Sequence, residues 1–150
     1  MNFTNTTIGL ASDHAGIDYK EIIKSHLKKR GLPYIDFGPY TTVSCDYPDY
    51  AHKLCGAITQ NEIEMGIVLC GTGNGMAMTC NKYGTIRAGI AWNVEVAQLI
   101  SAHNNANILV LPARFLSPEE LTPIIDACLD TPFEAGRHLT RINKMPLLKA

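Results

Sequence analysis

The sequence predicts an α/β protein with a parallel sheet of about five strands and helices on both faces. Short apolar runs of strand length alternate with segments of helical period along the whole chain, which is the pattern of a parallel α/β sheet. Three of these runs, 65–70, 84–92 and 105–113, lack polar alternation, as expected of strands buried on both faces. With 150 residues and neither an internal repeat nor a linker, the chain is expected to form one domain, 1–150.

The first half of the chain alternates strand, helix, strand, helix and strand. These elements are expected, in order, over 7–12, 16–31, 33–38, 48–61 and 65–70. Gly31 is placed to end the first helix. A stretch of turn composition, 39–50, separates the second strand from the second helix.

The second half continues the alternation. Strands are expected over 84–92 and 105–113, and helices over 93–103 and 117–130. Asn93 is a suitable cap for the first of these helices. Ser117, followed by Pro118 and by Glu120 three positions after the serine, is a strong signal for the start of the second.

Composition and charge exclude several classes of protein. The formal net charge is −1, with 13 basic and 14 acidic residues, which argues against partners such as nucleic acid or an anionic membrane. No apolar stretch approaches the 18 or so residues of a membrane span. The polar start, "MNFTNTT", lacks the regions of a signal peptide, so we expect a cytoplasmic protein. Five cysteines without a C-x-x-C pair fit neither a disulfide framework nor a zinc knuckle.

The stretch "VLCGTGNGMAMTCNK", 68–82, combines a cysteine with a glycine-rich loop. Its G-x-G-x-G spacing after the third strand matches neither a dinucleotide fingerprint nor a P-loop. Backbone N–H groups in such a loop can still form a nest for an anion, either a phosphate or an oxyanion formed during a reaction. Cys70 beside a helix start can be a reactive thiol, and the alternative is a buried cysteine that ends a core strand.

Polar residues also follow the other expected strands. Ligands of open parallel sheets bind at the carboxyl ends of the strands, so we expect these residues to line one edge of the sheet. The residues so grouped are Asp13, His14, Cys70, His103, Asn104 and Arg114.

The last segment, about 132–150, follows after the alternation is complete. Its apolar residues pack either on their own domain or on a partner subunit: Ile142, Met145, Leu147 and Leu148. Arg137 and Arg141 are four positions apart, so on a helix they project from one face. Two guanidiniums on one face suit a dianionic phosphate, and a solvated helix face is the alternative.

Six motifs taken together resemble one family. They are "SDHAG" near the start, "DYPDYA" at 46–51, "CGTGNG" at 70–75, "NK" at 81–82, "AHNNAN" at 102–107 and "GRHLTR" at 136–141. In this order they are similar to the type B ribose-5-phosphate isomerases, within a wider family that includes allose-6-phosphate and galactose-6-phosphate isomerases. The resemblance covers nearly the whole chain.

The resemblance implies a Rossmann-like three-layer α/β/α sandwich, acting as a homodimer or dimer of dimers with no cofactor and no metal. It implies interconversion of an aldose phosphate and a ketose phosphate through an enediolate, in the non-oxidative pentose phosphate pathway. Cys70 matches the base that moves a proton between C2 and C1, and His103 the acid that assists opening of the furanose ring. The sites of the family are built from two subunits, which favours a partner for the segment 132–150.

The resemblance also implies the residues that bind substrate. Asp13, Tyr47 and Asn104 match residues that contact the sugar. The backbone of five loop residues matches the anion hole for the enediolate: Gly71, Thr72, Gly73, Asn74 and Gly75. The phosphate-binding and neighbouring polar set is matched by His14, Arg114, Arg137 and Arg141.

One branch of the family has a glutamate base just after the loop. Met76 stands at that position and cannot accept a proton, so Cys70 is the expected base. An isomerase of six-carbon sugar phosphates is the first alternative function. A non-catalytic phosphate-sensing domain of flavodoxin-like build is a remote one.

Overall fold

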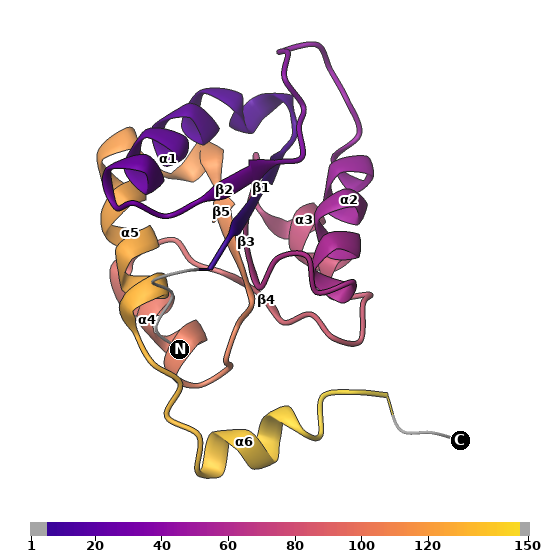
Figure 1. Ribbon diagram of the computed structural model, residues 1–150, viewed down its shortest axis with the longest axis vertical. Coiled ribbons are helices and arrows are strands. Elements are labelled where there is room, and N and C mark those ends of the chain that lie inside the picture. Colours follow the sequence, from indigo (N-terminus) through magenta and orange to yellow (C-terminus); the bar gives the residue numbers. More distant parts are fainter. Residues whose placement is uncertain (1–5, 148–150) are drawn as a thin grey trace.

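A five-stranded parallel sheet forms the centre of the molecule, and the computed structural model describes residues 6–147 around it (Figure 1). The strands are β1 (Ile8–Ser12), β2 (Tyr34–Asp36), β3 (Met65–Cys70), β4 (Ala88–Ile90) and β5 (Ile108–Pro112). They lie in the order β2-β1-β3-β5-β4, and all four neighbouring pairs are parallel. The predicted parallel sheet is therefore confirmed.

Helices cover both faces of this sheet, as expected. The α-helices are α1 (Ile17–Lys29), α2 (Tyr47–Thr59), α3 (Asn74–Cys80), α4 (Val94–Ala102), α5 (Pro118–Asp130) and α6 (Arg137–Ile142). Two short 3-10 helices, η1 (His14–Gly16) and η2 (Ala113–Phe115), follow β1 and β5. α1, α4 and α5 pack on one face of the sheet, and α2 and α3 pack on the other. None of the described helices is long and apolar enough to cross a membrane.

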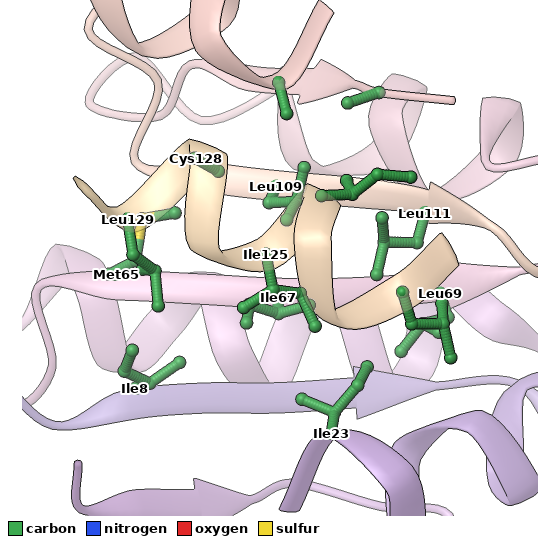
Figure 2. Close-up of a cluster of buried hydrophobic side chains, with 14 of the residues drawn as sticks. Ile8, Ile23, Met65, Ile67, Leu69, Leu109, Leu111, Ile125, Cys128 and Leu129 are labelled. Carbon is green, nitrogen blue, oxygen red and sulfur yellow. The ribbon is translucent and has the colours of Figure 1, made fainter. Parts of the chain in front are cut away.

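The core consists of two apolar layers, because successive residues of a strand point to opposite faces. Ile67 and Leu69 of β3 pack against the α1, α4 and α5 layer, where Ile125 of α5 covers β3 and β5 (Figure 2). Val68 and Cys70 of the same strand point into the α2 and α3 layer. Each fully buried valine, leucine or isoleucine of these layers stabilises the fold by about 1.5–3 kcal/mol.

Local signals in the sequence set the ends of several helices. Asn93 Oδ1 accepts a hydrogen bond from the N–H of Val96 at 2.8 Å and caps α4 as predicted. The carboxylate of Glu120 accepts from the N–H of Ser117 at 2.7 Å, which closes the predicted box at the start of α5. Gly31 ends the first helix with a φ of 69°, a left-handed conformation that favours glycine.

β4 differs most from its prediction. It is a half-buried strand of three residues, Ala88–Ile90, instead of a buried run over 84–92. The reason is its place at the edge of the sheet, where it has one neighbouring strand, β5. Residues 84–87 form a turn that is held by side chains instead of by a second strand.

The strand order creates a switch point between β1 and β3. From β1 the chain turns to β2 on one side, and β3 then lies on the other side of β1. Open α/β sheets bind ligands at the carboxyl ends of the strands beside such a point. We call the end of the sheet formed by the carboxyl ends of the strands the carboxyl edge, and the end formed by their amino ends the amino edge. Neither name refers to the outer strands β2 and β4.

Candidate active site

Cys70 is the last residue of β3, at the carboxyl edge, and its side chain is 5% exposed. The N–H of Gly73 donates a hydrogen bond to its sulfur at 3.2 Å. Gly73 can aim its N–H in this way because the loop turns back on itself, and its φ of 79° suits glycine. The sulfur of Cys70 therefore faces the glycine loop, at the end of the strand where ligands of such sheets bind.

The other N–H groups of the glycine loop have different roles. The N–H of Asn74 donates to Oγ1 of Thr72 at 3.3 Å, so this group and that of Gly73 already have acceptors. Gly75 and Met76 lie in the first turn of α3, where a helix leaves its N–H groups without backbone partners. An anion at this loop therefore has fewer backbone donors than the sequence 71–75 indicates. The side chain of Met76 is fully buried in the α2 and α3 layer.

Tyr47 and Arg114 lie directly against two glycines of this loop. A Cβ on Gly75 would lie 2.4 Å from Cζ and 2.8 Å from the hydroxyl of Tyr47, the first residue of α2. A Cβ on Gly71 would lie 3.2 Å from Cδ of Arg114, whose own N–H donates to the carbonyl oxygen of Gly71 at 3.0 Å. Both glycines are thus needed for close approach, and they bring a phenol and a guanidinium to the loop after Cys70.

Asp13 and His14 lie at the same edge, just after β1. The N–H of Asp13 donates to the carbonyl oxygen of Leu69 at 3.2 Å, which fixes Asp13 next to the end of β3. Its carboxylate accepts from the N–H of Ala15 at 2.9 Å and starts η1. His14 accepts from the N–H of Cys45 at 3.4 Å through Nδ1, so the 39–46 loop is tied to this edge.

The expectation that His103 and Asn104 share this edge is wrong within one chain. α4 connects two parallel strands, β4 and β5, and so must run against them and end at their amino ends. His103 caps that end of α4. The carbonyl oxygen of Asn107 accepts from the N–H of Gly66, near the start of β3, at 3.0 Å. His103 and Asn104 therefore lie at the amino edge, opposite Cys70.

His103 forms a cluster with His138 and Glu134 at the amino edge. The two imidazole rings stack with centroids 4.1 Å apart and planes 10° from parallel. Oε2 of Glu134 lies 3.8 Å from Nε2 of His103 and 3.6 Å from Nε2 of His138. Burial of His138, followed by the charges of His103 and Arg137, lowers the pKa of His138 below its usual value.

Among residues 6–147, this cluster is also the group of side chains whose ligand atoms lie close enough to consider a metal site. The ligand atoms of His103, Glu134 and His138 lie within 4.8 Å of one another. Stacked rings direct their nitrogen lone pairs side by side, whereas a shared ion needs them to converge. The arrangement therefore fits one carboxylate serving two imidazoles better than it fits a bound metal.

Arg137 and Arg141 both lie on α6, as their spacing predicted. Both side chains are exposed, and α6 lies beyond the amino edge, where its buried His138 contacts His103 (Figure 1). The apolar residues of this segment are exposed too: Leu139 by 46%, Met145 by 53% and Leu147 by 95%. Leu148 lies outside the described residues.

Sequence reasoning assigned no role to Glu134, or to His138 within the "GRHLTR" motif. Helical spacing does not bring them together, since Glu134 precedes α6 and Ala135 and Gly136 have a positive φ. Nothing in the sequence alone indicates that His138 stacks on His103, because this contact joins segments that are 35 positions apart.

The fold and the carboxyl-edge cluster define an α/β protein with a thiol and a glycine loop at the switch point of a parallel sheet, where such proteins bind small ligands. Residues 8–145 match the family described as Ribose/Galactose Isomerase, and the chain belongs to this family. The resemblance carried by the six motifs is thereby confirmed.

Individual relatives are similar over almost the whole chain. A putative sugar phosphate isomerase of Rickettsia bellii is 43% identical, over 92% of this chain and 96% of its own length. A ribose 5-phosphate isomerase from Thermotoga maritima has a crystal structure with a TM-score of 0.92 and 46% identity, covering 94% of this chain and 97% of that one. Ribose-5-phosphate isomerase B of Mycoplasma genitalium, solved with bound ribulose-5-phosphate, gives a TM-score of 0.89 and 39% identity, with 93% of each chain covered.

Proposed function

We propose that this chain, an isomerase by family, interconverts D-ribose 5-phosphate and D-ribulose 5-phosphate. The family match and the names of the similar structures support this substrate pair. An aldose–ketose isomerase needs a base beside C1 and C2 and donors for the enediolate oxygen. The observation that carries the proposal is the Cys70 thiol, which lies at the switch point and accepts an N–H at 3.2 Å.

Cys70 acts as a thiolate on the open-chain aldose. It removes the proton from C2, and the electron pair of that bond forms the C1–C2 double bond of the enediolate. The thiol then returns the proton to C1, while the proton of the 2-hydroxyl passes to O1 and C2 becomes the carbonyl carbon. A positioned base contributes about 10²–10⁴-fold to such a step. Each backbone donor to the enediolate oxygen contributes on the order of 3 kcal/mol.

His103 acts before this step, because ribose 5-phosphate is mainly a furanose ring. As the C1–O4 bond breaks, its electrons pass to O4, which takes a proton from the imidazolium of His103. The 1-hydroxyl loses a proton as the C1=O bond forms, so the imidazole is reprotonated and no net proton is consumed. Asp13, Tyr47 and Asn104 contact the sugar, and four cationic or polar side chains surround the phosphate: His14, Arg114, Arg137 and Arg141.

We further propose that a complete site needs two chains. Gly66 and Cys70 are separated by about 13 Å along β3. His103 lies beside the start of this strand and Cys70 at its end, with the packed core between them. One chain therefore supplies Cys70 to one site and His103, Arg137 and Arg141 to another. In a homodimer or dimer of dimers, the exposed apolar residues of the segment after α5 also gain a partner.

Cys70→Ala tests the role of the thiol. Turnover of ribose 5-phosphate should fall by a factor of about 10² or more while the sugar phosphate still binds. Binding is measured by calorimetry and turnover by the release of ribulose 5-phosphate. A variant with near-normal turnover would show that Cys70 is not the base. Binding without turnover in the unmodified protein would favour a phosphate-sensing domain instead.

Mixing variants tests the shared site. Cys70→Ala and Arg137→Ala change opposite edges, so a hybrid dimer of the two keeps one intact site. An equal mixture with random subunit exchange should recover about a quarter of the normal activity. Cys70→Ala mixed with Tyr47→Ala is the matched control, because both changes lie at one edge and no hybrid site is intact. Equal behaviour of the two mixtures, with exchange confirmed by mass spectrometry, would contradict a shared site.

A substrate panel tests the choice of sugar. Allose 6-phosphate and galactose 6-phosphate each have one carbon more than ribose 5-phosphate between the carbonyl and the phosphate. Activity on the six-carbon phosphates alone would overturn the proposed substrate.

We also propose a cytoplasmic location. All five cysteines are free thiols, which supports it.

A further inference from the structure

Arg87 holds the loop that carries His103 and Asn104. Its Nε donates to the carbonyl oxygen of Asn104 at 3.1 Å and to that of Asn105 at 2.9 Å. Arg87 comes from the turn just before β4, so these bonds join two segments of the amino edge. The single Nε–H is thus shared between two carbonyl oxygens in a three-centre hydrogen bond.

The backbone of Arg87 is itself fixed from both sides. Oδ1 of Asn107 accepts from the N–H of Arg87 at 2.8 Å, and Nδ2 of Asn107 donates to the carbonyl oxygen of Thr85 at 2.9 Å. On the other side, Asn81 both donates to and accepts from the backbone of Ala88, each at 2.9 Å. Asn81 belongs to the "NK" motif, and these hydrogen bonds give that motif a structural role. It follows the last residue of α3, so the helix that begins at the glycine loop ends in this network.

Packing alone does not fix the 104–107 loop. Asn105 has a φ of 46°, a left-handed conformation that costs free energy for a residue other than glycine. A cavity of about 380 Å³ is lined by Asn105 and Asn107, and a second cavity of about 750 Å³ is lined by Asn104. Arg87 lines both cavities. Backbone hydrogen bonds from Asn105 to Ser101 and from Ala106 to Ile100 hold the loop to α4, and the side chain of Arg87 ties it to the turn before β4.

The half-buried position of Arg87 is energetically unfavourable for a charged side chain. Burial lowers the pKa of its guanidinium. Among residues 6–147 the guanidinium has no ion pair with a carboxylate. Its bonds are instead to carbonyl oxygens of the loop. An uncharged side chain at this position would avoid the cost of desolvation. The presence of an arginine therefore indicates that its hydrogen bonds to the loop are needed to hold the loop in place.

We propose that Arg87 is a positioning residue that sets the place of His103 and Asn104 for opening of the sugar ring. This inference rests on the proposed function, in which His103 is the ring-opening acid. Arg87 does not touch the substrate. It holds the carbonyl oxygens directly after His103, so the imidazole meets the ring oxygen of the furanose in the correct geometry.

A substrate that cannot close a ring separates positioning from a general loss of structure. 4-Deoxyribose 5-phosphate has no 4-oxygen and its 5-oxygen carries the phosphate, so it is an open-chain aldose with the same span between C1 and the phosphate. Loss of the acid should therefore impair the reaction of ribose 5-phosphate much more than the reaction of the 4-deoxy substrate. A variant that is merely less well folded loses active protein and so loses both activities equally.

The test measures kcat/KM on ribose 5-phosphate and on 4-deoxyribose 5-phosphate for Arg87→Met, which keeps the apolar stem and removes the donors. We expect the value for ribose 5-phosphate to fall at least about tenfold more than the value for the 4-deoxy substrate. Arg87→Lys keeps the charge and one donor nitrogen, and should give a smaller difference between the two substrates. It also serves if Arg87→Met does not fold. Arg30→Met is the matched control, since Arg30 pairs with Asp126 and Asp130 on α5, away from this loop.

Equal losses on the two substrates, or none, for both Arg87 variants would overturn the inference. His103→Ala distinguishes this failure from a failure of the proposed function. If His103→Ala impairs ribose 5-phosphate selectively and the Arg87 variants do not, only the positioning role is wrong. If His103→Ala impairs both substrates equally, the ring-opening role of His103 is wrong and the inference fails with it. In the His103→Ala background, Arg87→Met should cause no further selective loss on ribose 5-phosphate.

Discussion

Gly75→Ala is a small change that should separate activity from stability. The new Cβ would lie 2.4 Å from Cζ of Tyr47, whereas carbon atoms in contact are about 3.5 Å apart. The ring of Tyr47 must therefore move by about 1 Å, since Gly75 is fixed in the first turn of α3. Gly75 has no positive φ, so the backbone of α3 accepts alanine without strain.

The expected result is a stable protein with poor turnover. Displacement by about 1 Å of a group that orients the substrate can cost on the order of 10²-fold in kcat/KM. Alanine also favours a helix over glycine by up to about 1 kcal/mol, which offsets part of the local rearrangement. The measurements are kcat/KM on ribose 5-phosphate and the urea unfolding midpoint of the same preparation.

Gly56→Ala is the matched control, because a Cβ on Gly56 of α2 meets no atom within 4 Å. It should keep normal activity and unfold at a slightly higher urea concentration. The reasoning also requires that Gly75→Ala has little further effect once Tyr47 is replaced by alanine. Normal turnover of Gly75→Ala, or an undiminished loss in the Tyr47→Ala background, would refute it.

Three further outcomes concern stability. Lys20→Met should cost about 3 kcal/mol in urea unfolding, because it leaves the carboxylate of Asp36, now 2.8 Å from Nζ, partly unpaired in the interior; a loss under 1 kcal/mol would contradict this. Asn93→Ala should lower the melting temperature by about 2–4 °C through loss of the α4 cap, and an unchanged melting temperature would count against that cap. The lowered pKa of His138 means that the unfolded chain binds its proton first, so stability should fall as the pH drops below about 6.5. His138→Gln should reduce this fall, and an identical pH dependence of unfolding in the variant would show that another group causes it.

Local signals predicted most of the fold. The buried strand 65–70 needed only its unbroken apolar run, and the α4 cap needed only Asn93. β4 was predicted too long because the apolar run 84–92 does not reveal that the strand lies at the edge of the sheet. Strand order depends on contacts between distant segments, and a single sequence carries little information on these.

The positions of the candidate site residues were likewise predicted only in part. Cys70 and Asp13 were placed correctly because both follow strands, whose carboxyl ends share one edge. His103 was misplaced because it follows a helix, and a helix between parallel strands runs in the opposite direction. The direction of the preceding element would have corrected this from the sequence. The contact between Gly75 and Tyr47 could not be predicted, because it joins positions that only the folded chain brings together.

The burial of Met76 limits how this enzyme can evolve. A lineage that uses a carboxylate base at this position needs a side chain that reaches the substrate, and Met76 points fully into the α2 and α3 layer. A single exchange to glutamate would place the new carboxyl group away from water, where burial raises its pKa and keeps it protonated. Such an intermediate would gain no base and would lose core packing. A change from the thiol base to a carboxylate base at this position therefore requires α3 to repack. The single substitution of Met76 by glutamate does not achieve it.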